Sequence, residues 1–322
     1  MILVTGAGGF ICSHLTEQLV RRGERVRAFI HYNSAGRRGW LDESSVAAEI
    51  EFVAGDIRDF DAVHRAVQGC SMVFHLAALA GIPYSYVSPQ AYLRTNIDGA
   101  FNVLEAARVC GVEKLVLTST SEIYGSAREI PMSELHPVHC QSPYAASKAA
   151  ADQLGLSYHR SFGLPVIIGR PFNTYGPRQS LRAVIPTIVA QLLSGDGEVE
   201  LGNLHPQRDF TFVEDTAAGF LAAAAMDSSI GDVVHIGSGT AVSVRELADR
   251  IGRLTGRAFK LKRDETRVRP EASEVDRLVC DNNKLRSSTG WQPLVTLEDG
   301  MRRTIEWLEP RLGTVRANEY SI

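Results

Sequence analysis

A tyrosine and a lysine in one predicted helix are spaced so that they could move a proton together. Tyr144 and Lys148 are four residues apart within 143–162, and this offset puts both side chains on one helix face. An ammonium beside a phenol, together with the cationic ring of a cofactor, would favour phenolate and lower the pKa of the tyrosine. The pair therefore indicates a base that works near neutral pH, although an ordinary surface pair has the same spacing.

Polar side chains follow the predicted strand over 114–118, immediately upstream of that helix. Open α/β sheets bind their ligands at the carboxyl ends of parallel strands, so Thr120, Ser121 and Glu122 are candidate catalytic residues. The alternative is that Glu122 belongs to a helix capping box begun by Ser119, a spacing that also fits.

A glycine cluster follows the first predicted strand and precedes a helix that we expect to begin near Ser13. Gly6 and Gly9 would let the backbone turn tightly and approach a pyrophosphate, which the helix N-terminus would bind. An ordinary turn is the alternative. Cys12 stands where a third glycine is usual, and we interpret it as a buried packing residue rather than a reactive thiol.

The residues after the second and third predicted strands bear on the choice of dinucleotide. An acidic residue after the second strand would bind the adenosine ribose of NAD, but this chain has His31, Asn33 and Ser34 there, with Arg37 close behind. NAD and NADP therefore both stay open, and the arginine could equally be a solvated loop charge. Asp56 could reach the adenine, or it could simply belong to a turn.

The composition indicates a globular protein and excludes several classes of function. The chain has 322 residues, a hydrophobic fraction of 44%, a charged fraction of 22% and a net charge of -3, so neither nucleic acid nor a membrane is an expected partner. Five scattered cysteines without a CxxC pair argue against disulfides and zinc, and we expect no metal site. The N-terminus has no signal-peptide pattern, which favours the cytoplasm.

Short apolar runs alternate with helical patterns through the first two-thirds of the chain. This alternation predicts an α/β fold with a doubly wound parallel sheet of the Rossmann type and a smaller α/β C-terminal substrate lobe. We expect the dinucleotide-binding domain to comprise 1–170 plus about 208–240. The second domain would comprise about 171–207 plus 241–322.

In combination, the motifs of this chain resemble the extended short-chain dehydrogenase/reductase family, and within it the NAD-dependent nucleotide-sugar epimerases and dehydratases. The motifs keep the same order along nearly the whole chain: Thr5-Gly6-x-x-Gly9-Phe10-Ile11, Gly55-Asp56, His75-Leu76-Ala77-Ala78, Tyr144-x-x-x-Lys148, Arg170-Pro171-Phe172-Asn173-x-Tyr175-Gly176-Pro177 and Arg208-Asp209-Phe210.

The resemblance implies a lyase, a nucleotide-sugar 4,6-dehydratase of the GDP-mannose or legionaminate-pathway type, because such enzymes carry Thr-Ser-Glu or Thr-Asp-Glu where this chain has 120–122. UDP-glucuronate decarboxylases also carry Thr-Ser-Glu, and a 4-epimerase would use the same scaffold. A non-catalytic dinucleotide-sensing protein is a more distant alternative.

The same resemblance implies roles for the candidate residues. Tyr144 would remove the proton of the sugar's 4-hydroxyl while hydride leaves C4, and Glu122 would take the C5 proton before water leaves C6. Hydride then returns to C6 and gives a 4-keto-6-deoxy sugar. Thr120 would hydrogen-bond the 4-oxygen, and Lys148 would hold the nicotinamide ribose. Ser121 replaces the aspartic acid of many dehydratases, so either Glu122 or a water would protonate the leaving hydroxyl.

Finally, the resemblance implies two ligands and a homodimer formed by helices over about 89–109 and 143–162. The residues expected to hold a tightly bound NAD or NADP are Gly6, Gly9, Phe10, Ile11, His31, Asn33, Ser34, Arg37, Asp56, Ile57, Leu76, Ala77, Ala78, Thr118, Tyr144, Lys148 and Pro171. Those expected to hold a UDP- or GDP-linked hexose or hexosamine are Ser85, Asn173, Arg182, Arg208, Arg269 and Glu271.

Overall fold

A seven-stranded parallel sheet forms the centre of the larger lobe. The computed structural model describes residues 1–195 and 197–314. In spatial order the strands are β10 (Val233–Ile236), β6 (Val166–Pro171), β5 (Lys114–Thr118), β4 (Met72–His75), β1 (Ile2–Thr5), β2 (Val26–His31) and β3 (Ile50–Gly55). The chain reverses its direction of travel across the sheet between β1 and β4, which is where such sheets bind ligands.

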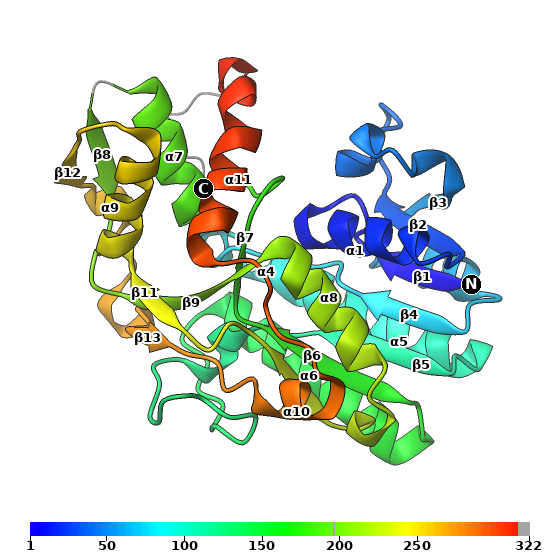
Figure 1. Cartoon of the computed structure of the whole chain (residues 1–322). Coiled ribbons are helices and arrows are strands. Elements are labelled where there is room, and N and C mark those ends of the chain that lie inside the picture. Colours follow the sequence, from blue (N-terminus) through cyan, green and yellow to red (C-terminus); the bar gives the residue numbers. More distant parts are fainter. Residues whose placement is uncertain (196, 315–322) are drawn as a thin grey trace.

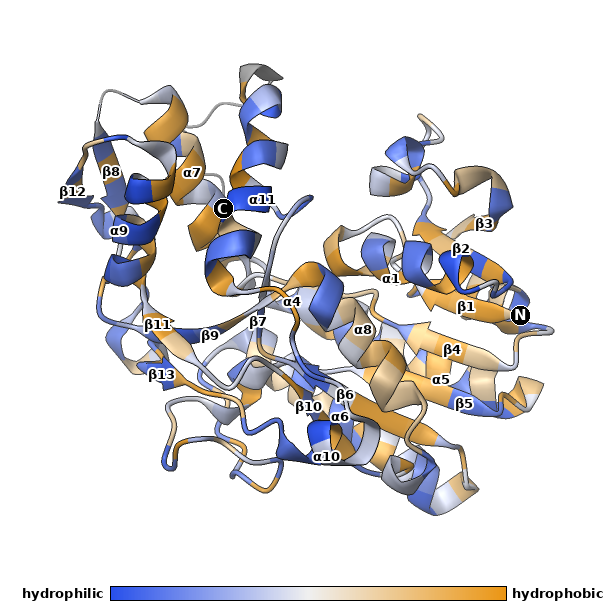
Figure 2. Ribbon diagram, in the orientation of Figure 1, coloured by the Kyte–Doolittle hydropathy of each residue, from blue (hydrophilic) through white to orange (hydrophobic). Residues whose placement is uncertain are grey.

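Helices cover both faces of this sheet, so the predicted α/β doubly wound fold is confirmed (Figure 1). One face packs against α1 (Phe10–Arg21) and α8 (Val213–Ala224), and the other against α2 (Phe60–Val67), α5 (Gly99–Cys110) and α6 (Pro143–Phe162). The strands between them are mostly apolar (Figure 2), as expected for a parallel sheet that is buried on both faces.

A smaller lobe is built from two short sheets and three helices. One sheet contains β11 (Ala241–Ser243), β9 (Gln207–Phe212), β13 (Arg277–Leu278) and β7 (Asn173–Tyr175), and the other pairs β12 (Lys260–Arg263) with β8 (Glu198–Leu201). Its core lies among α7 (Val184–Ser194), α9 (Val244–Thr255) and α11 (Leu297–Leu308).

The division between the lobes differs in two places from the predicted ranges. Strand β9 pairs with β7, β11 and β13, so the chain returns to the larger lobe at α8 rather than near residue 208. Helix α10 (Asn283–Thr289) packs against α8 and β10 and therefore lies with the larger lobe. In both cases an apolar face is covered by the lobe that the sequence ranges did not assign to it.

The helix expected over 89–109 is interrupted. After α3 (Ile82–Val87), the chain forms α4 (Pro89–Tyr92), a π-helical turn over Leu93–Asp98 and then α5. The wider turn brings Asn96 inward, where its amide bonds the backbone of Leu79 and the hydroxyl of Ser147 on α6. Among the described residues, no helix is long and apolar enough to cross a membrane.

Candidate active site

The glycine turn after β1 makes close backbone contacts that a side chain would prevent. Gly6 has a φ of +70°, and a Cβ there would lie 2.9 Å from the Cα of Ala77. Gly9 caps α1 without a side-chain hydrogen bond, and no acidic residue stands in the first turn. The helix begins at Phe10, not near Ser13 as predicted, because the Ser13 N–H donates to the Gly9 carbonyl and so closes the first helical turn.

The first turn of α1 is packed against the smaller lobe. Phe10 and Ile11 are partly buried against that lobe's core. Cys12 is 8% exposed, and burial raises the pKa of its thiol to about 12, so it stays protonated at neutral pH. This agrees with the interpretation of Cys12 as an inert packing residue.

The loop after β2 lies over the glycine turn. The N–H of Trp40 donates to the Gly8 carbonyl at 3.0 Å, and a Cβ on Gly8 would meet the carbonyl of Arg38. Asn33 holds the loop together, because its amide bonds the backbone of His31 and of Arg37. The side chains of His31, Ser34 and Arg37 are exposed at this edge.

Asp56 is largely committed to its own turn. Its carboxylate accepts from the Arg58 N–H at 2.9 Å and pairs with the Arg58 guanidinium at 2.5 Å, which lowers the pKa of the carboxyl to about 2. The neighbouring Ile57 is buried against Gly99 of α5.

The end of β4 backs onto the glycine turn. The Thr5 hydroxyl bonds His75 Nδ1 at 2.8 Å and accepts from the Ala77 N–H at 3.1 Å. Leu76, Ala77 and Ala78 are therefore held beside Gly6, each partly exposed. Burial and then the charge of Lys148 lower the pKa of His75 to about 3, so this histidine is neutral.

Helix α6 positions Tyr144 and Lys148. Ser142 caps the helix by accepting from the Ala145 N–H at 3.1 Å, and Pro143 opens its first turn. One turn of helix then places the two side chains on the same face. Lys148 is 4% exposed, and burial lowers the pKa of its ammonium to about 8.

Tyr144 does not have the lowered pKa that its spacing from Lys148 suggested. Burial raises the pKa of its phenol to about 12, the charge of Glu122 raises it further, and a hydrogen bond with Thr120 works in the opposite direction. Desolvation therefore outweighs the favourable contact, and a lowered pKa is not produced by the protein's side chains alone.

The turn after β5 brings Thr120 and Glu122 to Tyr144. Residues 121–124 form a short 3-10 turn whose cap is Thr120, which accepts from the Glu122 N–H at 3.3 Å. The alternative capping box begun by Ser119 is therefore not formed, because the Ser119 hydroxyl donates to Asp152 instead. Ser121 is 2% exposed.

Two predicted substrate-binding arginines, Arg208 and Arg269, extend the cluster into the smaller lobe, together with Glu274, a glutamate that the sequence did not predict. Arg208 on β9 is 7% exposed and lies 4.0 Å from the Glu122 carboxylate and 3.7 Å from that of Glu274. Glu274 also lies 3.8 Å from the Arg269 guanidinium and accepts from the Asn203 amide at 2.8 Å. The predicted acidic residue, Glu271, is exposed instead, because it lies in a separate turn.

The remaining predicted residues have different surroundings. Thr118 and Asn173 each have a buried side-chain oxygen without a hydrogen-bond partner among the described residues, and Pro171 ends β6 two residues before Asn173. Ser85 is fully buried and its hydroxyl donates to the Ile82 carbonyl at 2.6 Å, so in this arrangement it offers no surface to a ligand. Arg182 is exposed. Burial raises the pKa of Tyr92 and the charge of Arg182 lowers it, and the Tyr92 ring packs edge to face against that of Tyr144.

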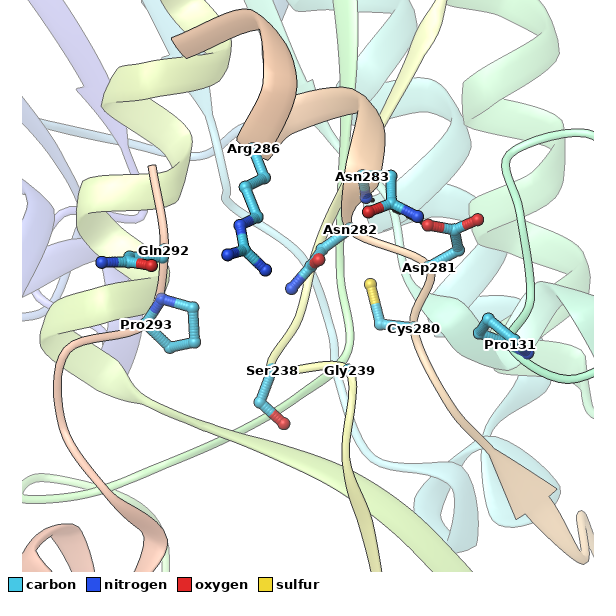
Figure 3. A pocket seen from close by; sticks show the side chains of 10 residues that line it. All are labelled: Pro131, Ser238, Gly239, Cys280, Asp281, Asn282, Asn283, Arg286, Gln292 and Pro293. Carbon is cyan, nitrogen blue, oxygen red and sulfur yellow. Dashed lines mark hydrogen bonds between the residues drawn. The ribbon is translucent and has the colours of Figure 1, made fainter. Parts of the chain in front are cut away.

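A separate polar cavity of about 380 Å³ lies between the loop after β10 and α10 (Figure 3). Ser238, Asn282, Arg286 and Gln292 are among the residues that line it, and it contains none of the predicted site residues. Within 1–195 and 197–314, no cluster of three or more His, Cys, Asp or Glu side chains is arranged to hold a metal ion.

Comparison with known proteins places this arrangement in a family. The family model described as GDP-mannose 4,6 dehydratase matches residues 3–304. The dTDP-glucose 4,6-dehydratase of Streptomyces niveus is 34% identical over 313 residues, which are 95% of this chain and 92% of that protein. The UDP-N-acetyl-alpha-D-glucosaminuronate decarboxylase of Bacillus cytotoxicus is also 34% identical, over 317 residues that are 95% of this chain and 96% of that protein.

A solved structure extends the likeness to the whole fold. The DesIV dTDP-glucose 4,6-dehydratase of Streptomyces venezuelae, with NAD bound, superposes with a TM-score of 0.88 at 31% identity and covers 97% of this chain and 98% of its own. The glycine turn, the Tyr144–Lys148 pair and these matches agree, and the chain belongs to the NAD-dependent epimerase/dehydratase group of the extended short-chain dehydrogenase/reductase family.

Proposed function

We propose that this protein is a nucleotide-diphosphate-sugar 4,6-dehydratase that uses NAD. The observation that carries the proposal is the carboxylate of Glu122, which acts on the Tyr144 phenol from the adjoining strand end. A dehydratase needs one base at the 4-hydroxyl and a second at C5, whereas a 4-epimerase leaves C5 intact. The two groups together therefore favour dehydration.

The glycine turn supports a dinucleotide. A Cβ at Gly6 or Gly8 would meet the backbone of Ala77 or Arg38, so glycine at both positions lets the turn stay compact. The uncapped N-terminus of α1 offers N–H groups and the positive end of a helix dipole to a pyrophosphate. Arg38 pairs with Asp42 and stacks on Phe52, and NAD is bound in the DesIV structure, so we favour NAD over NADP.

The first half of the proposed reaction depends on α6 and the turn after β5. Tyr144 accepts the proton of the sugar's 4-hydroxyl, and Thr120, already within reach of the phenol, orients the 4-oxygen. Lys148 supplies a positive charge one turn along the helix, which favours phenolate. The cofactor supplies a reversible hydride acceptor for C4.

The second half depends on Glu122. Its carboxylate accepts the C5 proton, which oxidation at C4 has acidified, and then gives a proton to the hydroxyl that leaves C6 as water. Ser121 is a hydroxyl without useful acidity near neutral pH, so Glu122 does both jobs. One further proton returns to C5, which balances the proton that Tyr144 removed, and C6 receives the hydride.

The buried Arg208 and the half-buried Arg269 are proposed to hold the nucleotide end. A guanidinium fork suits the oxygens of a diphosphate, and Arg208 and Arg269 both converge on Glu274. Arg269 Nη1 lies 3.8 Å from Glu274 and makes no hydrogen bond among the described residues, so it keeps a donor that a phosphate oxygen can accept from. Asn173 offers its unpartnered amide oxygen from the neighbouring strand β7.

Decarboxylation of a nucleotide-linked uronic acid is the second candidate. Arg208 lies 4.0 Å from Glu122, so a cation stands where the carboxylate of a uronate could bind. The decarboxylase of Bacillus cytotoxicus is as similar to this chain as the dehydratase of Streptomyces niveus. The acid that many dehydratases place at position 121 is a serine here.

Product analysis separates these reactions. The purified protein would be incubated with dTDP-glucose, GDP-mannose, UDP-N-acetylglucosamine and UDP-glucuronate in separate reactions, and each product weighed by mass spectrometry. Loss of water from a hexose supports the dehydratase, loss of carbon dioxide from the uronate supports the decarboxylase, and an unchanged mass with a new configuration supports a 4-epimerase. Chromatography of the released cofactor distinguishes NAD from NADP.

We also propose that the protein forms a homodimer through the face made by the π-helical turn, α5 and α6. Leu93, Phe101, Val109 and Phe162 are each at least 45% exposed on this face. Exposed aromatic and aliphatic groups on neighbouring elements commonly mark an interface between subunits.

A further inference from the structure

A buried ion pair lies one helical turn beyond Lys148. Asp152 on α6 and Arg170 on β6 are 2% and 3% exposed, and their nearest atoms are 2.8 Å apart. The same Asp152 oxygen, Oδ2, accepts from the Ser119 hydroxyl at 2.5 Å. Both of these partners stand at the ends of strands that flank the reaction site.

Arg170 is held in place from its other side. Its Nε donates to the Ser119 hydroxyl at 3.1 Å, and Nη1 donates to the hydroxyl of Tyr124, whose ring lies 4.7 Å below the guanidinium. Tyr124 in turn bonds His235 Nε2 at 2.5 Å. Asp152 Oδ2 therefore has two buried partners, Arg170 and Ser119, which restrain the orientation of the carboxylate.

The second carboxylate oxygen, Asp152 Oδ1, is buried and has no hydrogen-bond partner among the described residues. Lys148 is four residues earlier on the same helix, which places the two side chains on one face. Burying an unpaired carboxylate oxygen is costly unless a nearby charge compensates for it. Arg170 pairs with the other carboxylate oxygen, Oδ2, and the charge of Asp152 also acts on the pKa of the buried Lys148 ammonium.

None of the other titratable groups described around Lys148 supplies the negative charge that would keep its ammonium protonated. His75 on β4 is neutral, and Tyr144, Tyr92 and Tyr124 are phenols whose pKa values burial raises. Glu122 acts on the Tyr144 phenol and lies beside Arg208. Asp152 is the charged group that opposes the effect of burial on the pKa of Lys148.

We infer that Asp152 is a positioning residue which keeps the Lys148 ammonium charged and aligned with Tyr144, with Ser119 and Arg170 holding its carboxylate in that role. The inference rests on the proposed function, because a charged lysine matters when Tyr144 must become a phenolate. It also makes a claim about Lys148 that can be tested without a substrate.

The direct test measures the ionisation of Lys148 in the NAD-loaded protein. NMR of protein labelled with ¹³C at the lysine ε carbons follows each ammonium against pH, and a Lys148→Arg variant assigns the signal. In Asp152→Asn the Lys148 titration should move to lower pH by about one pH unit, since an opposite charge close by has been removed. Asp152→Glu should restore most of the shift.

Arg170→Gln is the matched variant on the other side of the ion pair. It removes the same buried pair and should lower the melting temperature as Asp152→Asn does, but it leaves the carboxylate and should not move the Lys148 titration to lower pH. If either variant fails to fold, the double variant Asp152→Leu/Arg170→Leu leaves no buried charge unpaired. Its Lys148 titration should follow that of Asp152→Asn.

A merely structural role predicts a different result. The variants would then lose stability while Lys148 titrated as in the wild type, and that outcome overturns the inference. Activity gives a second readout: the alkaline limb of the kcat profile should move with the Lys148 titration. Failure to turn over any nucleotide sugar would contradict the proposed function. It would not affect the NMR test, because the Lys148 titration is measured without substrate.

Discussion

Burial moves the pKa values of Tyr144 and Lys148 in opposite directions, and both shifts favour the neutral form. The phenol is pushed toward its neutral form, with a pKa of about 12, and the ammonium also toward its neutral form, with a pKa of about 8. A base near neutral pH therefore depends on keeping the charge of Lys148. Each residue's role follows from its neighbours rather than from the Tyr-x-x-x-Lys spacing itself.

The pKa of Lys148 predicts the direction in which kcat changes with pH. Lys148 is charged below its pKa and neutral above it, so kcat should fall as the pH rises through about 8. Steady-state rates measured across the alkaline range, with stability checked at each pH, test this. A rate that held steady up to the ordinary lysine value of 10.5 would contradict it.

Replacing the phenol tests the base directly. Tyr144→Phe should lower kcat by about a thousandfold, in the range usual for the loss of a general base, while the dissociation constant of the nucleotide sugar stays nearly unchanged. Tyr84→Phe removes the hydroxyl of a tyrosine that is 36% exposed and should keep wild-type rates. Equal rates in the wild type and Tyr144→Phe would remove Tyr144 from the mechanism.

Glu122 has a more specific signature. Glu122→Gln should abolish exchange of the C5 hydrogen with solvent deuterium, because the group that removes that proton is gone, while oxidation at C4 can still occur. Reduced cofactor, seen by its absorbance, should then accumulate. Glu129→Gln, an exposed position in the loop that follows, is the control. Undiminished exchange in Glu122→Gln would assign the C5 proton to another residue.

Among the single elements, the glycine turn after β1 can be tested by adding a methyl group at Gly6. Gly6→Ala would place a methyl 2.9 Å from the Ala77 backbone at a φ of +70°, so the protein should purify with much less cofactor. Gly23→Ala has the same kind of strain, with a φ of +82°, but nothing within 4 Å of its Cβ. It should cost about 1 kcal/mol of stability and keep the cofactor.

The measurement is the ratio of bound dinucleotide to protein in the two variants, with melting temperatures as the second readout. Equal loss of cofactor in both would show that backbone strain, rather than crowding at the turn, determines binding.

The sequence was sufficient for the elements whose signals are local. Alternating apolar runs predicted the parallel sheet, and strand ends followed by Gly6, Thr120 and Glu122 predicted the edge at which the site forms. The start of α1 was placed too late, because Gly9 carries no side chain that would mark it as a cap.

Features that depend on distant contacts could not be predicted in the same way. Glu274 was missed in favour of Glu271, since both are acidic residues in one irregular segment and only pairing with Arg208 distinguishes them. The raised pKa of Tyr144 depends on how deeply the phenol is buried, which spacing does not reveal. The sequence did offer one local sign: the apolar Val275, which is buried, directly follows Glu274.

At the scale of the whole molecule, side chains from both lobes meet at the site. His14 on α1 bonds the Pro177 carbonyl, and Arg178 lies 2.8 Å from Glu17. The rings of Trp40 and Trp307 meet edge to face at 5.3 Å, and this contact joins the loop over the glycine turn to α11. These contacts hold the smaller lobe, which carries Arg208 and Glu274, against the larger lobe, which carries Tyr144.

The proposed dimer interface can be tested by placing a charge on its exposed apolar face. Phe162→Glu would place a charge on a side chain that is 58% exposed on the α5–α6 face, and it should convert the dimer to a monomer in light scattering. Leu294→Glu, at a position 78% exposed after α10, should leave the mass unchanged. A wild-type protein that is monomeric at micromolar concentration would contradict the proposal.

The product formed in deuterated water tests the proposed dehydration most directly. From a suitable nucleotide hexose we expect a product lighter by one water, with a 4-keto group, a 6-methyl group and one solvent deuterium at C5, because Tyr144 and Glu122 act on the same sugar ring. Dehydration would be contradicted by a hexose recovered without loss of water, whether or not it had exchanged hydrogen for deuterium. It would also be contradicted if the only turnover were loss of carbon dioxide from a uronate.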